Sequence, residues 1–166
     1  MKRLVVPMMA ALFLACCVGA PRVVSYYVDR GVMQYYLMPS TFHGEGATLS
    51  IDFAIRVEAN QEQPAICNFT IKAKKDLPRT IRRAHFQLLD SGGDIELREI
   101  VVLFIERRDN EIRMTSTMEV ADFRRLLLTQ EVTLSVESDG KELIFIPARG
   151  FYRTIKDAGI EIIDES

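Results

Sequence analysis

Cysteine is scarce in this chain of 166 residues, and tryptophan is absent. Cys16 and Cys17 are adjacent near the start, and Cys67 is the only other cysteine. Cysteines in these positions form neither a zinc-binding spacing nor a disulfide framework. We therefore expect no metal and no cofactor. Cys67 alternates with Phe69 and Ile71, which predicts a buried thiol that packs as a small hydrophobic residue.

The chain also lacks an excess of positive or of negative residues. The chain has 21 lysines and arginines and 23 aspartates and glutamates, which gives a formal net charge of −2. The arginine pairs at 82–83, 107–108 and 124–125 stand apart from one another, and no basic run joins them. A basic patch or stripe is the electrostatic signature of nucleic-acid binding. We therefore expect no nucleic-acid partner.

Sequence motifs of catalysis are missing as well. The chain contains no HExxH, no GxSxG and no P-loop. Of its two histidines, His43 lies in the glycine-flanked loop 42–46, and His85 lies in a predicted strand. We expect a non-catalytic protein with no catalytic residues. A small hydrolase in which His43 and nearby carboxylates act as acid and base is one alternative.

The N-terminal apolar run is too short to span a membrane, which takes roughly 20 apolar residues. Lys2 and Arg3 precede the apolar stretch 4–14, and small residues follow it from Ala15 to Ala20. A basic start, a short apolar run and a small-residue end are typical of a secretory signal. The sequence therefore predicts a signal peptide over residues 1–16 and a single β-rich domain over residues 17–166.

The end of this signal resembles that of bacterial lipoproteins, in which a leucine and two small residues precede a lipidated cysteine. The matching residues are 14–17, Leu-Ala-Cys-Cys, with a second cysteine where glycine or alanine is usual. The resemblance implies cleavage before Cys17 or Cys16 and lipidation of that cysteine. Ordinary cleavage near Ala20 is the rival, although Pro21 disfavours it. We expect export to the bacterial periplasm or outer surface, with a lipid anchor in the membrane.

Apolar residues alternate with polar ones along most of the remaining chain. This period of two predicts strands over 49–57, 67–73, 81–88, 95–105 and 112–118. One helix is expected around 117–128, begun by a capping box between Ser116 and Glu119. Residues 151–158 fit a further short helix or turn, and 160–163 a closing strand. The fold class we expect is mostly β, an antiparallel β-sandwich or a barrel, with that one short α-helix.

Two hairpins are indicated by turn residues. Asp139-Gly140 suits a two-residue turn, and counting outward places Val136 opposite Leu143 and the apolar residues on one face. An earlier hairpin joins 24–28 to 32–36 through residues 29–31. Its four tyrosines would lie two on each face of the hairpin, and they are Tyr26, Tyr27, Tyr35 and Tyr36.

The stretch Ile100–Ile105 is apolar at every position. Apolar side chains on both faces of a strand suit either a central strand covered on both sides or a strand that reaches across an interface. Both interpretations stay open at the level of sequence.

The tyrosine hairpin is the best candidate for a binding site. Exposed tyrosines offer a large rigid contact surface with a polar tip, which suits a protein or glycan partner. We therefore expect an exported, lipid-anchored, non-catalytic envelope protein that acts as a binding or assembly module. The alternatives are the hydrolase named above and a β-barrel carrier of an apolar ligand. The sequence does not indicate an oligomeric state.

Overall fold

A computed structural model describes residues 21–163, except 30, 59–60, 76–77 and 79. Residues 1–20, which hold the predicted signal and lipidation cysteines, lie outside the described part. The elements are β1 (Val23–Asp29), β2 (Val32–Gly44), β3 (Ala47–Glu58), β4 (Gln61–Glu62), β5 (Ala65–Ala73), β6 (Ile81–Leu88), β7 (Asp94–Glu106), β8 (Glu111–Met118), α2 (Val120–Leu128), β9 (Val132–Ser138), β10 (Lys141–Pro147) and α3 (Arg149–Ile163).

Eight strands close into an antiparallel barrel in the order β2-β10-β9-β6-β7-β8-β5-β3, and the β2–β3 hairpin completes the circle. Strands β1 and β4 pair outside this circle with β2 and β3 respectively. The mostly-β prediction is confirmed, and of the two architectures left open the chain forms the barrel. Pairing of β2 with β3 removes the two edges that these strands would expose in an open sheet.

Aromatic side chains fill the barrel interior. Phe42, Phe53 and Phe86 are at most 2 % exposed. The ring centroids of Phe42 and Phe86 lie 6.3 Å apart, as do those of Phe53 and Phe86. The predicted burial of Cys67 among such side chains is confirmed, because its exposure is 0 %. The barrel axis is therefore occupied by packed side chains.

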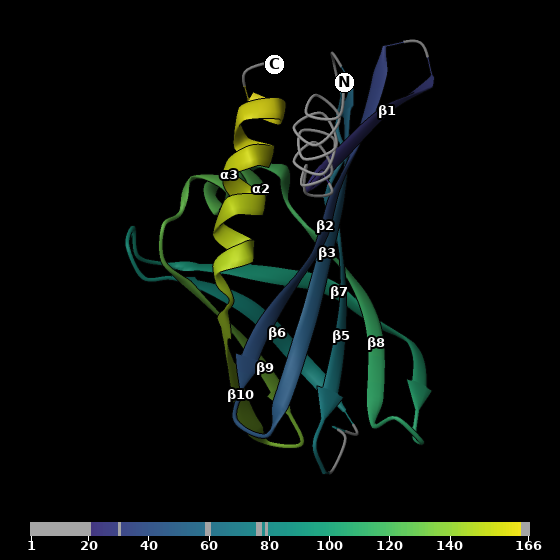
Figure 1. Ribbon diagram of the computed structural model, residues 1–166, viewed down its shortest axis with the longest axis vertical. Helices are drawn as coiled ribbons and strands as arrows, with labels where there is room; N and C mark the ends of the chain where they lie inside the picture. Colours follow the sequence, from purple (N-terminus) through teal and green to yellow (C-terminus); the bar gives the residue numbers. More distant parts are fainter. Residues whose placement is uncertain (1–20, 30, 59–60, 76–77, 79, 164–166) are drawn as a thin grey trace, which may run out of the picture.

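Two helices pack at one end of the barrel (Figure 1). From α2, Phe123 contacts Phe53 with a centroid distance of 5.7 Å, and from α3, Phe151 meets Phe42 edge-on at 4.9 Å. Helix α3 also lies along the N-terminal half of β2. Figure 1 shows that this half extends beyond the barrel. The helices thus extend the same aromatic core that the strands enclose.

Two local predictions at the helices are wrong. Glu119 is the N-cap of α2 and makes no capping bond with its side chain, and Ser116 stays in β8 and donates to the Cys67 carbonyl at 3.4 Å. Strand pairing with β5 thus overrides the capping box. Residues 160–163 continue α3 and do not form a closing strand. The apolar residues of α3 recur at helical spacing, with Ile155 and Ile162 buried.

Pro39 marks the point at which β2 exchanges partners. Residues 32–37 of β2 pair with β1, and residues 42–44 pair with β10 along the same edge. A bulge between Leu37 and Ser40 separates the two ladders. Pro39 has no N–H to donate and lies inside this bulge, next to Met38, whose N–H still donates to the Arg22 carbonyl at 2.8 Å.

The predicted β9–β10 hairpin is confirmed. Asp139 and Gly140 both have positive φ, 50° and 74°, and Val136 pairs with Leu143 as the turn requires. The tyrosine hairpin is also present as β1 and β2, with Gly31 at φ 77°. Residue 30 of its turn lies outside the described residues.

Strand β7 leaves the barrel halfway along its length. Its residues 94–97 pair with β6, whereas its residues from Arg98 to Glu106 pair with β8. Glu99 has φ 52°, and its bulge bends β7 away from β6. Just before this point Arg83 holds Glu96 by three hydrogen bonds, from Nε to Oε1 at 2.8 Å and to Oε2 at 3.1 Å, and from Nη2 to Oε2 at 2.7 Å. These bonds from Arg83 lower the pKa of Glu96.

Candidate functional site: a tyrosine face on β1–β3

The pairing of β1 with β2 decides where the four tyrosines point. Tyr26 pairs with Gln34, so it shares a face with Gln34 and with Tyr36 two residues on. Tyr35 lies on the opposite face, where it is 3 % exposed in the hydrophobic core. Tyr27 shares that second face but projects beyond the core and is 75 % exposed. The expectation of two tyrosines on each face is confirmed.

The solvent-facing side carries a connected group of side chains, which we call the tyrosine face: Tyr26, Gln34, Tyr36 and Arg56. The rings of Tyr26 and Tyr36 stack with centroids 5.4 Å apart and planes 19° from parallel. Gln34 donates from Nε2 to the Tyr36 hydroxyl at 2.5 Å and accepts at Oε1 from Arg56 Nε at 3.0 Å. The side chains therefore fix one another's orientation.

Hydrogen bonding within this group also shifts the pKa of Tyr26. The hydrogen bond with the Tyr36 hydroxyl, followed by partial burial, raises this pKa. The shift favours the neutral phenol, whose hydroxyl can donate a hydrogen bond. Arg56 adds a cation that cannot lose its proton in a protein. The tyrosine face thus presents aromatic rings, hydroxyl groups and one fixed positive charge.

Apolar side chains continue this surface along β1. Val24 pairs with Tyr36 on the same face and is 39 % exposed, and Val28, in the bulge between Tyr27 and Asp29, is 46 % exposed. A face that mixes exposed valine, stacked tyrosine and arginine has the composition that is enriched in protein interfaces. Its groups are suited to contact and hydrogen bonding, and it holds neither a nucleophile nor an acid–base pair.

His43, on which the hydrolase alternative depends, lies elsewhere. It is exposed at the end of β2, where its backbone pairs with Thr48 and Ile146. Within the described residues no carboxylate lies within hydrogen-bond distance of its imidazole. The same part of the chain contains no cluster of three or more histidine, cysteine, aspartate or glutamate side chains that could hold a metal ion.

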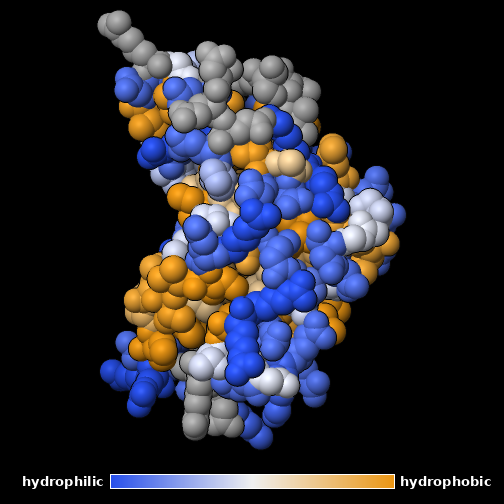
Figure 2. All heavy atoms as spheres, turned by 180° about the vertical axis from the view of Figure 1, so that it is seen from behind, coloured by the Kyte–Doolittle hydropathy of each residue, from blue (hydrophilic) through white to orange (hydrophobic). Residues whose placement is uncertain are grey.

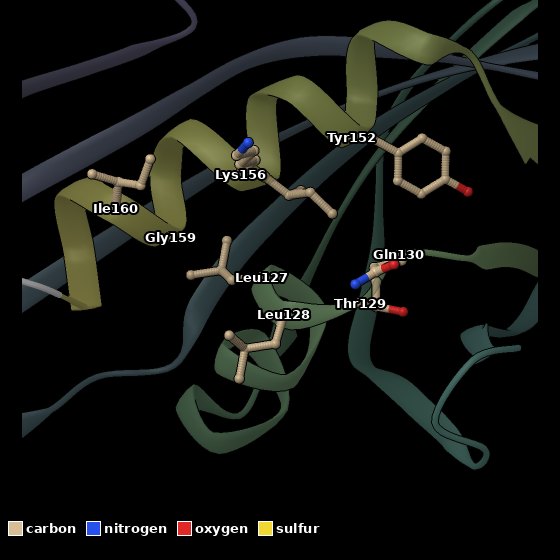
Figure 3. Close-up of a pocket in the computed structure, with 9 residues that line it drawn as sticks. Leu127, Leu128, Thr129, Gln130, Tyr152, Lys156, Gly159 and Ile160 are labelled. Carbon is tan, nitrogen blue, oxygen red and sulfur yellow. The ribbon is translucent and has the colours of Figure 1, made fainter.

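A surface groove of about 610 Å³ runs between α2 and α3 (Figure 3). Leu127 and Leu128 line it from α2, and Tyr152 and Ile160 line it from α3. Tyr152 closes one end, where its hydroxyl accepts from the Val132 N–H at 3.3 Å. The groove lies outside the barrel, so it differs from the internal cavity that a barrel carrier would need.

Sequence reasoning missed Gln34 and Arg56. Both lie on predicted strands at positions that alternate with core residues, which places them on the face away from the core. Arg56 is exposed on that face, whereas Gln34 is only 7 % exposed among its neighbours there. Their contact depends on the β2–β3 pairing, in which Gln34 lies opposite Arg56. Counting residue pairs outward from the turn 44–46 gives the wrong partner for Gln34 unless the bulge between Leu37 and Ser40 is included. This bulge shifts the register by one residue.

No protein-family model, no curated protein and no solved structure matches this chain. Among the helices of the described residues, none combines the length and the apolar character needed to cross a bilayer.

Proposed function

We propose that this protein is an exported, lipid-anchored, non-catalytic module of the bacterial envelope that binds a macromolecular partner through the tyrosine face. The observation that carries the proposal is the stacked pair of Tyr26 and Tyr36, held by Gln34 and Arg56 and left open to solvent. Side chains that are already oriented lose little entropy when a partner binds.

A protein is the partner that this surface favours. Val24 and Val28 extend the tyrosine face along β1 and are about as exposed as Tyr26, whose exposure is 47 %. Burial of such apolar area drives protein association, whereas sugar recognition relies more on free ring faces with polar groups around them. The stack already covers one face each of Tyr26 and Tyr36. A glycan partner is the second possibility.

Export and lipidation are supported by the first 17 residues alone. The basic start, the apolar run and the two cysteines favour an anchored protein, and a tethered domain has to act through contacts made near the membrane surface. Neither alternative gains support from the geometry. His43 has no acid–base partner among the described residues, and packed phenylalanines occupy the barrel interior.

Site-specific photo-crosslinking in the native cells tests the binding role. A photoreactive phenylalanine analogue at Val24, which pairs with Tyr36 on the tyrosine face and is 39 % exposed, is compared with the same analogue at Ile144, 55 % exposed on β10. We expect a discrete adduct of higher mass from position 24 only. Tyr26→Ala removes half of the stack and should lower the adduct yield at least about tenfold, if it contributes the 1.4 kcal/mol or more of a typical hot spot.

The fate of the adduct identifies the class of partner. Sensitivity to protease indicates a protein, and sensitivity to glycan hydrolases indicates a glycan. Adducts of equal yield from positions 24 and 144, or no adduct from either, would overturn the proposed binding role of the tyrosine face.

A further inference from the structure

Among the described residues, the outer half of β7 has one strand edge without a partner, and this half is made mostly of apolar residues. We call residues Ile100–Glu106 the β7 edge. Five consecutive side chains in it, Val101 to Ile105, are each between 43 % and 53 % exposed. From Arg98 onward β7 pairs with β8 on one side, and no described strand pairs with it on the other. Figure 2 shows the resulting hydrophobic area on the flank of the molecule where β7 and β8 lie.

Such an edge is a hazard for a free monomer. Exposed edges are templates for pairing with another chain, and natural proteins protect them with charge, proline, β-bulges or very short length. The β7 edge has no charged residue and no proline between Ile100 and Ile105. Its register against β8 shifts twice, between Arg98 and Val101 and between Val102 and Phe104, and Glu99 in the first shift has φ 52°. These shifts leave the five apolar side chains exposed. The edge is thus suited to a strand supplied from outside the barrel.

We propose that the β7 edge pairs antiparallel with the β7 edge of a second copy of this chain, about a two-fold axis at Val102. Two-fold symmetry of this kind is the commonest form of homodimer, and it requires a self-complementary surface. The pairing would join two barrels through one continuous sheet, and the apolar side chains on both faces would be covered by their symmetry mates. This inference does not depend on the proposed export or on the tyrosine face.

The charges at the ends of the β7 edge fit this register. With Val102 opposite its own copy, Arg98 lies opposite Glu106 at both ends of the paired segment. Arg98 and Glu106 also share a face, because their β8 partners are Thr117 and Glu111, an even number of residues apart. Opposite charges in directly facing positions stabilise a strand pair.

Other registers are worse. A two-fold axis perpendicular to the sheet keeps side chains on their own face, so registers differ in steps of two. A step in one direction sets Arg98 opposite Arg108. A step in the other direction brings Glu106 against Glu96, whose edge is already occupied by β6.

Within one copy, the residue that faces Glu106 on the neighbouring strand is not a cation. Its partner on β8 is Glu111, and like charges in facing positions are destabilising. Arg98 holds Glu119 through Nη1 at 2.5 Å. The planar guanidinium carries further N–H donors that can hold a second carboxylate. Arg98 of a second copy would therefore offset the charge of Glu106.

The area is compatible with a small homodimer. Five side chains of roughly 150–200 Å² each, about half exposed, give on the order of 400 Å² of apolar surface per copy. Two copies with their flanking charged residues approach the roughly 1,000 Å² that a specific interface needs. We therefore expect a reversible dimer.

Sedimentation of the full chain in a density-matched non-ionic detergent tests the dimer. We expect a concentration-dependent shift from one to two copies. Val102→Asp should raise the Kd at least about tenfold, because it places two carboxylates face to face. Ile66→Asp is the matched control, since Ile66 on β5 is 45 % exposed against 43 % for Val102. A monomer at every concentration, or equal effects of the two variants, would overturn the proposal.

Cysteine substitution tests the register. Val102→Cys should give an oxidised dimer on a non-reducing gel, beyond any dimer formed by the unchanged chain, and Ile66→Cys should not. Arg98→Glu and Glu106→Arg should each weaken the dimer, whereas the double exchange should restore it, because opposite charges again face each other. Thermal melts show whether each variant is folded. A folded double variant that fails to dimerise contradicts the proposed pairing.

Discussion

At the scale of single residues, the close approach of β2 to β10 depends on Gly44. A Cβ atom added at this position would lie 2.8 Å from Phe145 Cδ1 and 2.9 Å from the Ile144 carbonyl oxygen. Both neighbours belong to β10, and Phe145 is completely buried. The seam between these strands therefore has no space for a side chain at position 44.

Gly44→Ala should destabilise the fold. Overpacking against a backbone oxygen and a buried ring costs about 1–3 kcal/mol in comparable cores. The free energy of unfolding, measured by urea denaturation, should fall by that amount. Gly150→Ala is the control, because nothing lies within 4 Å of a Cβ at position 150 in α3 and alanine favours helix. Equal stability of the two variants would contradict the proposed close contact.

At the scale of elements, Asp90 ties the end of β6 to the segment that leaves α2. Its Oδ2 accepts from the Gln130 N–H at 2.6 Å, and its Oδ1 accepts from the Thr129 hydroxyl at 2.7 Å. These hydrogen bonds, with that from Gln130 the strongest, lower the pKa of Asp90 to about 2. One side chain thus connects a strand turn to the exit of a helix.

Asp90→Asn should change how stability depends on pH. Because the pKa of Asp90 is lower in the folded than in the unfolded protein, its contribution is present above the unfolded pKa of about 4 and is lost as the pH falls toward 2. The melting temperature of the variant should therefore be lower than that of the natural chain at pH 7, and the two should converge near pH 2.

The control for Asp90 is Glu45→Gln. Glu45 is exposed in the β2–β3 turn, and no described residue hydrogen-bonds to its carboxylate. This variant should follow the natural chain at all pH values. A difference between Asp90→Asn and the natural chain that persists unchanged from pH 7 to pH 2 would show that the carboxylate charge of Asp90 is not what stabilises the turn.

At the scale of the whole molecule, the barrel, its helical end and its two open surfaces have separate roles. The filled interior and the helices make a rigid body, because the aromatic contacts run from Phe151 through Phe42 and Phe86 to Phe53 and Phe123. The tyrosine face and the β7 edge lie on different strands of this body. A lipid-anchored protein with both surfaces could bind a partner and pair with its own kind at once.

The anchor is tested by the intact mass of the mature protein extracted from membranes. We expect a chain that begins at Cys17 or Cys16 and carries acyl chains on that cysteine. Cys17→Ser should release the protein from the membrane or block its processing if Cys17 is the acceptor, and Cys16→Ser is the matched control. A mature chain that begins at Pro21 without lipid would contradict the anchor.

Local pattern was enough to predict the strands, the two hairpins and the burial of Cys67. In each case the information lies within a few residues, because a strand alternates its faces and a tight turn requires particular residues. The predictions of a capping box at Ser116 and of a closing strand over 160–163 were wrong, because contacts with residues far along the chain decided these two structures. Pairing with β5 kept Ser116 in β8, and packing on the barrel made 160–163 part of α3.

The sequence by itself determined a mostly-β chain, the signal-like start, and which residues alternate toward a core. Only the tertiary structure decided that the sheet closes, that Gln34 meets Arg56, and that Ile100–Ile105 is an open edge and not a covered central strand. The physical reason is that closure and edges depend on pairings between residues far apart along the chain. A strand's own residues indicate its two faces but not which neighbours it will have.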